Sequence, residues 1–146
     1  MEVSSGRALG IDLGDKRIGI AICDADRLVA TPLETINRVG NRPLEHDRIA
    51  ELVADHEVTV VVVGLPLSLS GEVGPAARKV LSEVKGLRKR LAAEIVTHDE
   101  RLSTVDAQGS LRRQGLKGQK GRAVIDQVAA SVILQSWIDS GTRSHK

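Results

Sequence analysis

A run of β-branched residues near the middle of the chain, Val58 to Val63 (VTVVVV), sets the tightest limit on the fold. A short apolar run without polar alternation is typical of a strand that is buried on both faces. Helical patterns flank it, from Pro43 to about His56 and from Pro75 to Leu91, each with proline at a first-turn position. A buried strand between helical crossovers predicts a parallel arrangement of strands covered by helices.

The first forty residues follow a different pattern, with strict alternation of apolar and small or polar residues. Arg7 to Asp12 and Ile18 to Cys23 both alternate, and turn-forming residues, Gly14 to Lys16, lie between them, which predicts a hairpin. Leu28 to Ile36 predicts a third strand that Pro32 weakens or places at an edge. With a short strand at Ile95 to Asp99, we expect an α/β domain whose mixed five-stranded sheet has three antiparallel strands, then parallel strands, and helices on both faces.

The last third of the chain predicts two more helices separated by a glycine-rich segment. Ser103 to Gln114 begins with an N-cap pattern, the segment Gly115 to Gly121 is expected to be a loop, and Arg122 to Ser140 is apolar on most sides. We expect one domain over residues 1–140 and a short, flexible polar tail over residues 141–146.

Composition removes several classes of function. Trp137 is the only aromatic residue, so modules that stack bases on aromatic side chains are disfavoured. Cys23 stands alone and cannot form an internal disulfide or a cysteine zinc site, which favours a reducing, cytoplasmic setting. No apolar stretch approaches the roughly 18 residues of a membrane span.

Charge is distributed unevenly along the chain. Residues 1–57 hold 7 Lys or Arg and 11 Asp or Glu, whereas residues 58–146 hold 14 and 8. Between Ala107 and Ile125 all five charged residues are basic, and a second basic cluster lies in the helical pattern after Pro75. Such clusters attract phosphates, although either one is equally consistent with a solvated helix face. The second cluster consists of Arg78, Lys79, Lys85, Arg88, Lys89 and Arg90.

Three acidic residues occupy positions that the predicted topology brings to one edge of the sheet. Asp12 ends the first strand, Glu100 follows the last strand beside Asp99, and Asp126 is expected in the first turn of the apolar helix. A carboxylate at position 126 of this apolar helix can be explained in two ways. Either the helix dipole stabilises its charge, or it binds Mg²⁺ or Mn²⁺. Two such ions, about 3.5 to 4 Å apart on shared carboxylates, can hydrolyse phosphodiester bonds. The four histidines lack ligand spacing, which disfavours zinc.

Four motifs follow one another along the chain. They are GIDLG at Gly10 to Gly14 with Lys16, VGLPL at Val63 to Leu67, DERLST at Asp99 to Thr104, and DQVAA at Asp126 to Ala130 followed by Ile133 and Leu134. In sequence and order they resemble those of the YqgF family, and the similarity extends from about Ala8 to Ile138. The resemblance implies an RNase H-like fold and a nuclease related to Holliday-junction resolvases that processes the 5′ end of the small-subunit rRNA precursor.

The same resemblance implies roles for individual residues. Asp12, Glu100 and Asp126 would be the catalytic carboxylates that bind two Mg²⁺ or Mn²⁺ ions, with Asp99 a weaker fourth ligand. Lys16 and Arg101 would contact substrate phosphate, although either could instead pair with a neighbouring acid. Beside these, a mobile basic flap over the acidic site is expected to bind phosphate through Lys117, Lys120 and Arg122.

Other functions remain open at this level. A Holliday-junction resolvase would use the same carboxylates on branched DNA and would need a dimer, whereas the partner could equally be precursor rRNA bound by a monomer. A non-catalytic rRNA-binding protein is a third alternative, because Gly118 to Gly121 forms a G-x-x-G pattern like the clamp loop of KH domains. The GIDLG string also resembles the phosphate loop of sugar kinases and actin, but those proteins close nucleotide between two such domains. No membrane partner is expected.

Overall fold

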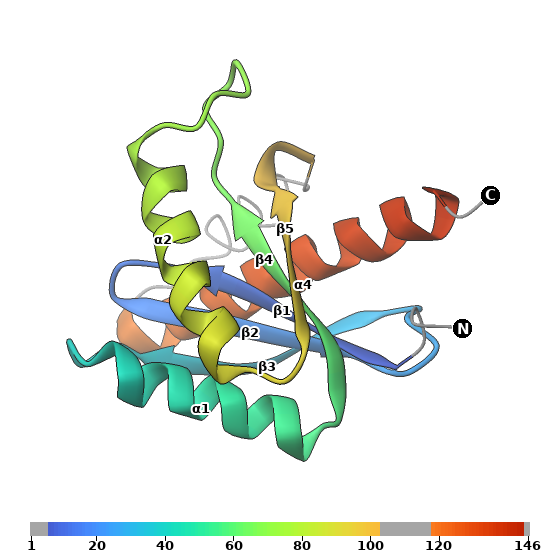
Figure 1. Ribbon diagram of the computed structural model, residues 1–146, viewed down its shortest axis with the longest axis horizontal. Helices are drawn as coiled ribbons and strands as arrows, with labels where there is room; N and C mark the ends of the chain where they lie inside the picture. Colours follow the sequence, from blue (N-terminus) through green and yellow to red (C-terminus); the bar gives the residue numbers. More distant parts are fainter. Residues whose placement is uncertain (1–5, 103–117, 145–146) are drawn as a thin grey trace.

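The computed structural model describes residues 6–102 and 118–144, and Figure 1 shows one sheet with helices packed on both of its faces. The strands are β1 (Arg7–Leu13), β2 (Arg17–Cys23), β3 (Ala30–Asn37), β4 (Val58–Leu65) and β5 (Glu94–Asp99). The helices are α1 (Arg42–Asp55), α2 (Pro75–Arg90) and α4 (Gly118–Ser144), with a short 3-10 turn, η1 (Glu100–Leu102), after β5.

The sheet has the strand order β3-β2-β1-β4-β5. β1, β2 and β3 pair antiparallel, whereas β4 pairs parallel with both β1 and β5, as the sequence predicted. β3 lies at an edge, where Pro32 costs the fewest ladder hydrogen bonds. β4 lies between two strands and is buried on both faces, which explains its unbroken β-branched run.

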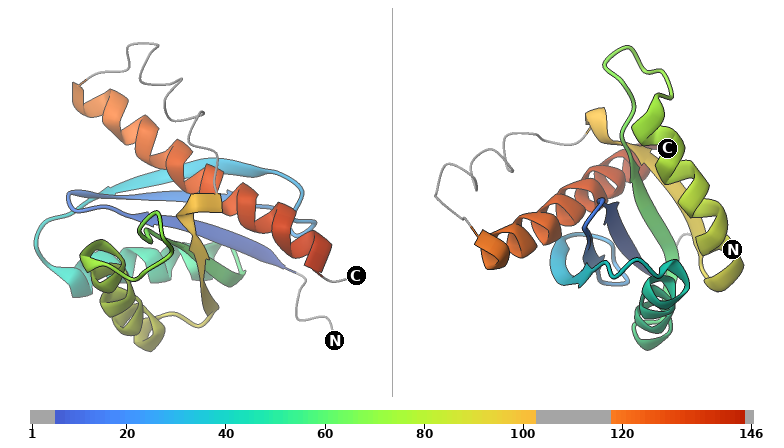
Figure 2. Two further views of the ribbon diagram at one scale, coloured as in Figure 1. Left: turned by 90° about the horizontal axis from the view of Figure 1, so that it is seen from above. Right: turned by 90° about the vertical axis from the view of Figure 1, so that its left-hand side faces the viewer.

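Two hydrophobic cores lie on opposite faces of the sheet, because successive side chains of a strand point to opposite sides. Leu9 and Ile11 of β1 join the core beneath α1 and α2, whereas Ala8 of β1 joins the smaller core beneath α4. Figure 2 shows α1 and α2 on one side of the sheet and α4 on the other. Asp12 has the same parity as Ala8 and therefore faces the α4 side.

Helix α4 differs from its predicted course. It begins at Gly118 and not at Arg122, so the segment 118–121 that we expected in a loop is helical. Asp126 consequently lies in the third turn and not the first, and the helix dipole no longer accounts for it. The helix also continues to Ser144, through residues that we expected to begin the tail. The G-x-x-G pattern is therefore not a KH-type clamp loop.

The rest of that region lies outside the described residues. This applies to the predicted helix Ser103 to Gln114 and to Lys117. The backbone of Lys120 and Arg122 is part of α4, so the expected basic flap is helical at least from Gly118 onward. The side chains of these two residues are not described. Over the described ranges, no helix is long and apolar enough to cross a membrane.

Candidate nuclease site

Asp12 lies in the middle of a row of glycines that crosses the sheet at its carboxyl edge. Its Cα partner on β2 is Gly19, and on β4 the residue after Val63, the partner of Ile11, is Gly64. Gly64 in turn pairs with His98 of β5. One glycine therefore lies on each side of Asp12, and neither places a side chain on the α4 face of the sheet beside the Asp12 carboxyl group.

The other two predicted acids fill the space above these glycines. A Cβ atom on Gly19 would lie 2.0 Å from the main-chain oxygen of Asp126, and one on Gly64 would lie 2.8 Å from Oε2 of Glu100. The contact at Gly19 is with the main chain, so this position requires glycine for α4 to come this near, whereas at Gly64 the close atoms are the ends of the Ile133 and Glu100 side chains, which would have to shift. The three predicted carboxylates, from β1, η1 and α4, therefore lie along one line on one face.

The carboxyl groups are close enough to affect one another's protonation. Burial, and then the charge of Asp126, raise the pKa of Asp12 to about 6. Burial, followed by the charges of Asp12 and Asp99, raises the pKa of Glu100 to about 7. Asp12 is thus coupled to both other members, and the metal-free site is electrostatically strained at neutral pH.

Arg17 is the residue that our sequence reasoning missed. Its Nε donates to Asp126 Oδ2 at 2.5 Å, and both side chains are about four-fifths buried, with 22% and 23% of their areas exposed. Arg17 has the same strand parity as Gly19, the partner of Asp12, and this alternation was the signal that could have placed it at the site. The partner that a mostly buried Asp126 requires is therefore the Arg17 guanidinium.

Asp99 and Arg101 pair with each other, the alternative that the sequence left open for Arg101. Arg101 donates from Nε and Nη2 to the Asp99 carboxylate, with a shortest distance of 2.6 Å, and its backbone N–H donates to the same group. The Arg101 hydrogen bond lowers the pKa of Asp99. Nη1 of Arg101 also donates to the Leu69 carbonyl, so the pair anchors the loop that follows β4.

The two remaining polar groups near the site differ in their surroundings. Lys16 is exposed in the β1–β2 turn, and no described acid pairs with its ammonium group. His98 is buried on the α4 side, with its Nε2 2.9 Å from Ser136 Oγ, and burial lowers its pKa. A neutral, hydrogen-bonded His98 supports the packing of α4 and leaves Lys16 as the cation available to a phosphate.

The carboxylates fit a hard divalent cation by the chemistry of their donors. All three offer oxygen ligands, and the pKa values of Asp12 and Glu100 are raised by burial and then by neighbouring negative charge, which a cation would offset. As placed, no three His, Cys, Asp or Glu side chains among residues 6–102 and 118–144 form a group that could hold an ion. The Arg17 bond occupies Oδ2 of Asp126, so this oxygen would have to exchange its partner to bind a shared ion.

Comparison with known proteins identifies the family. Residues 6–140 match the family model described as "RuvX: Holliday junction resolvase". A Streptomyces coelicolor protein is 48% identical over 92% of this chain and 81% of its own length. A Streptomyces avermitilis protein is 45% identical over 100% of this chain and 94% of its own length. Both relatives carry the name "Putative pre-16S rRNA nuclease".

A solved structure supports the same fold. RuvC of T. thermophilus, in complex with a Holliday junction substrate, superposes with a TM-score of 0.58 over 94% of this chain and 97% of the RuvC chain, at 16% identity. At that identity the likeness concerns the RNase H-like fold alone. The family match and the identity to the curated relatives decide the assignment: this chain is a member of the RuvX/YqgF family of nucleases.

Proposed function

We propose that this chain is a divalent-metal-dependent nuclease that hydrolyses a phosphodiester bond at the 5′ end of precursor 16S rRNA, in the cytoplasm. The names of the curated relatives support the substrate, and the fold and family support the nuclease activity. The observation that carries the proposal is the position of Asp12 between Gly19 and Gly64, with Asp126 and Glu100 packed over those two glycines.

Asp12, Glu100 and Asp126 would hold the metal, with Asp12 between the other two. Two Mg²⁺ or Mn²⁺ ions bound there would activate water and stabilise the leaving oxygen. The protein's own contribution is to orient the three carboxylates from β1, η1 and α4, and a bound cation would favour the ionised forms of Asp12 and Glu100, whose pKa values the fold raises. Asp99 is a weaker ligand in this proposal, because its oxygens already accept from Arg101.

The cations around the site would bind the substrate. Lys16 extends from the β1–β2 turn beside Asp12 and is free to contact a phosphate oxygen. Arg17 neutralises Asp126 and would face the phosphate when Asp126 exchanges it for a metal. Lys117, Lys120, Arg122 and Arg101 remain proposed phosphate contacts. Water attack in line at phosphorus would give a 5′-phosphate and a 3′-hydroxyl.

A cleavage assay with three conservative variants tests this proposal. Asp12→Asn, Glu100→Gln and Asp126→Asn should each reduce cleavage of precursor 16S rRNA in Mg²⁺ or Mn²⁺ by about 100-fold or more, because each removes a charged oxygen ligand. Asp139→Asn is the matched control on α4, since Asp139 is exposed and accepts only from Gln135 among the described contacts. Full activity in any of the three variants would remove that residue from the mechanism.

The family description favours a second substrate, so the assay includes a four-way DNA junction. Cleavage of the junction alone would replace the rRNA proposal with junction resolution. Binding of either substrate without cleavage in Mg²⁺, Mn²⁺ or chelator would make the chain a binding protein.

A further inference from the structure

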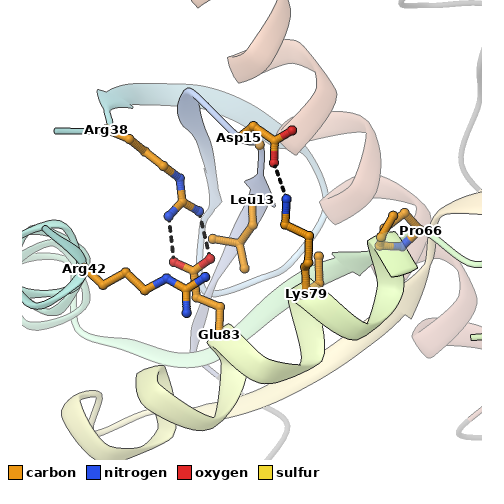
Figure 3. A pocket seen from close by; sticks show the side chains of 10 residues that line it. Leu13, Asp15, Arg38, Arg42, Pro66, Lys79 and Glu83 are labelled. Atoms are coloured by element: carbon orange, nitrogen blue, oxygen red, sulfur yellow. Dashed lines mark hydrogen bonds and ion pairs between the residues drawn. The ribbon is translucent and has the colours of Figure 1, made fainter. Parts of the chain in front are cut away.

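A groove lies on the face of the sheet opposite the carboxylates. A pocket of about 380 Å³ opens at the carboxyl edge, where it is lined by Leu13, the residue after Asp12, and by Pro66, the residue after β4 (Figure 3). A second pocket, of about 480 Å³, lies between α1 and α2. Arg42 and Glu83 line both pockets, which therefore adjoin. We call the two pockets together the α1–α2 groove.

The α1–α2 groove is predominantly cationic. Half of the basic cluster that follows Pro75 in the sequence lines this groove. The other basic residues that line it come from the start of α1 and from the position that follows β3. Five cationic side chains line it against two carboxylates: Arg38, Arg42, Lys79, Lys89 and Arg90 against Asp15 and Glu83.

The Glu83 carboxylate is already neutralised within the protein. It is 4% exposed, and it accepts two hydrogen bonds from Arg38 (Figure 3) and one from His46 Nε2 at 2.7 Å. Burial alone would raise the pKa of Glu83, but the bonds from Arg38 and His46 lower it. This buried cluster fixes α1 to α2 and forms the floor of the groove without adding free negative charge.

The charges at the rim of the groove are available to a ligand. Arg42 and Lys89 are exposed, and neither makes a hydrogen bond or an ion pair with the part of the chain that the structure describes. Lys79 pairs with Asp15 at 3.1 Å, but the two side chains are 67% and 85% exposed, so this pair contributes little and can exchange for another anion. An anionic ligand would therefore meet two unpaired cations and a third that is weakly held.

We propose that the α1–α2 groove binds the phosphodiester backbone of the substrate strand, beyond the bond that is cleaved at Asp12. Leu13 connects the two regions, since it begins the groove and follows Asp12 on β1. A strand that passes over the carboxyl edge of the sheet would meet the carboxylates on one side and Arg42 and Lys89 on the other. The inference rests on the proposed function to the extent that the substrate is a nucleic acid.

The test measures how tightly the wild-type protein and two variants bind a single-stranded RNA from the 5′ region of precursor 16S rRNA. Binding is followed by fluorescence anisotropy in chelator over a range of salt concentrations. The variant Arg42→Gln/Lys89→Gln removes the two unpaired charges, and Lys85→Gln is the matched control, because Lys85 is exposed on α2 but does not line either pocket. The double variant should bind the RNA about tenfold more weakly at low salt. The slope of log Kd plotted against the logarithm of the salt concentration should fall by roughly 1.4, about 0.7 for each lost phosphate contact. Lys85→Gln should match the wild-type protein.

The outcomes separate this proposal from the proposed function. If the double variant keeps the wild-type affinity and salt slope while the wild-type protein cleaves RNA, the groove proposal is wrong and the nuclease proposal stands. If the double variant loses affinity and slope but the wild-type protein cleaves no RNA in Mn²⁺, the groove proposal stands and the nuclease proposal fails. An equal loss in Lys85→Gln, or a wild-type protein that binds no RNA, would overturn the groove proposal. A thermal melt of each variant confirms that it is folded.

Discussion

Asp12 and Glu100 have pKa values near neutrality because they are buried beside other carboxyl groups. Asp126 is held by its ion pair with Arg17. A divalent cation would therefore compete with protons at Asp12 and Glu100, and with the Arg17 guanidinium at Asp126. Metal affinity should accordingly fall as the pH is lowered.

The stability of the metal-free protein should depend on pH through these two acids. Their pKa values rise on folding from ordinary values of 3.8 and 4.5 to about 6 and about 7. Between about pH 4 and pH 7 the unfolded chain loses these protons first, so the free energy of unfolding should decrease as the pH rises through that range. Below about pH 3 both states are largely protonated and the contribution should be constant.

Glu100→Gln measures the share of Glu100 in this effect. In chelator at pH 8 the variant should be more stable than the wild-type protein by about 1 to 2 kcal/mol, a value reduced for partial solvent screening, and equal to it near pH 4. Urea unfolding at the two pH values gives both numbers. The same pH dependence in both proteins would show that Glu100 is not repelled by its neighbours.

At the level of helices and strands, the glycines of the sheet determine how closely α4 and η1 approach it. Gly19→Ala would place a Cβ 2.0 Å from the Asp126 main-chain oxygen, and Gly64→Ala would place one 2.6 Å from Ile133 Cδ1. Gly19→Ala should destabilise the protein by about 1 to 3 kcal/mol and reduce activity, because the main chain of α4 that carries Asp126 must move. Gly64→Ala should destabilise it less, because only the ends of the Ile133 and Glu100 side chains must shift, and should reduce activity by displacing the Glu100 carboxylate.

Gly86→Ala is the matched control for these substitutions. Its Cβ would make an ordinary contact, 3.6 Å from His46 Cε1, in the interior of α2. It should stabilise the protein by about 0.5 to 1 kcal/mol, because alanine favours the helix. Thermal or urea unfolding should show a lower unfolding free energy for Gly19→Ala and Gly64→Ala and a higher one for Gly86→Ala. Equal destabilisation by all three substitutions would show that the sheet glycines have no special role.

Glu83 connects the two helices on the other face. Glu83→Ala would leave His46 buried without its carboxylate and the Arg38 guanidinium with Glu45 as its remaining partner, and should cost about 3 kcal/mol of unfolding free energy. Because the pKa of Glu83 is lowered on folding, the stability that it provides is present above its ordinary pKa of 4.5 and is lost as the pH falls through the lower folded value. Urea unfolding of both proteins at neutral and acidic pH should therefore show their difference shrinking in acid, and a constant difference would contradict this assignment.

Over the whole molecule, the sequence predicted the sheet well because its signals were local. The alternation of Arg7 to Asp12, the unbroken run from Val58 and the proline of β3 each predicted a feature that the structure confirms. The predicted start of α4, at Arg122, was wrong. Gly118 and Gly121 have low intrinsic helix propensity, so the segment that contains them was interpreted as a loop.

The carboxylate site was only partly accessible to sequence reasoning. Chain order and strand ends predicted that Asp12, Glu100 and Asp126 would lie on one edge, but the partner of Asp126 depends on the register between β1 and β2, which brings Arg17 under α4. The α1–α2 groove depends on the packing of two helices that are separated by a strand, and no local pattern specifies which of their basic residues face one another.

The most direct test of the account is a crystal structure of the protein with Mn²⁺, analysed by anomalous scattering. The account predicts a manganese peak at bonding distance from Asp12, with Glu100 and Asp126 as further ligands and the Arg17 guanidinium no longer hydrogen-bonded to Asp126. An intact Arg17–Asp126 pair, with no manganese at Asp12, would contradict it.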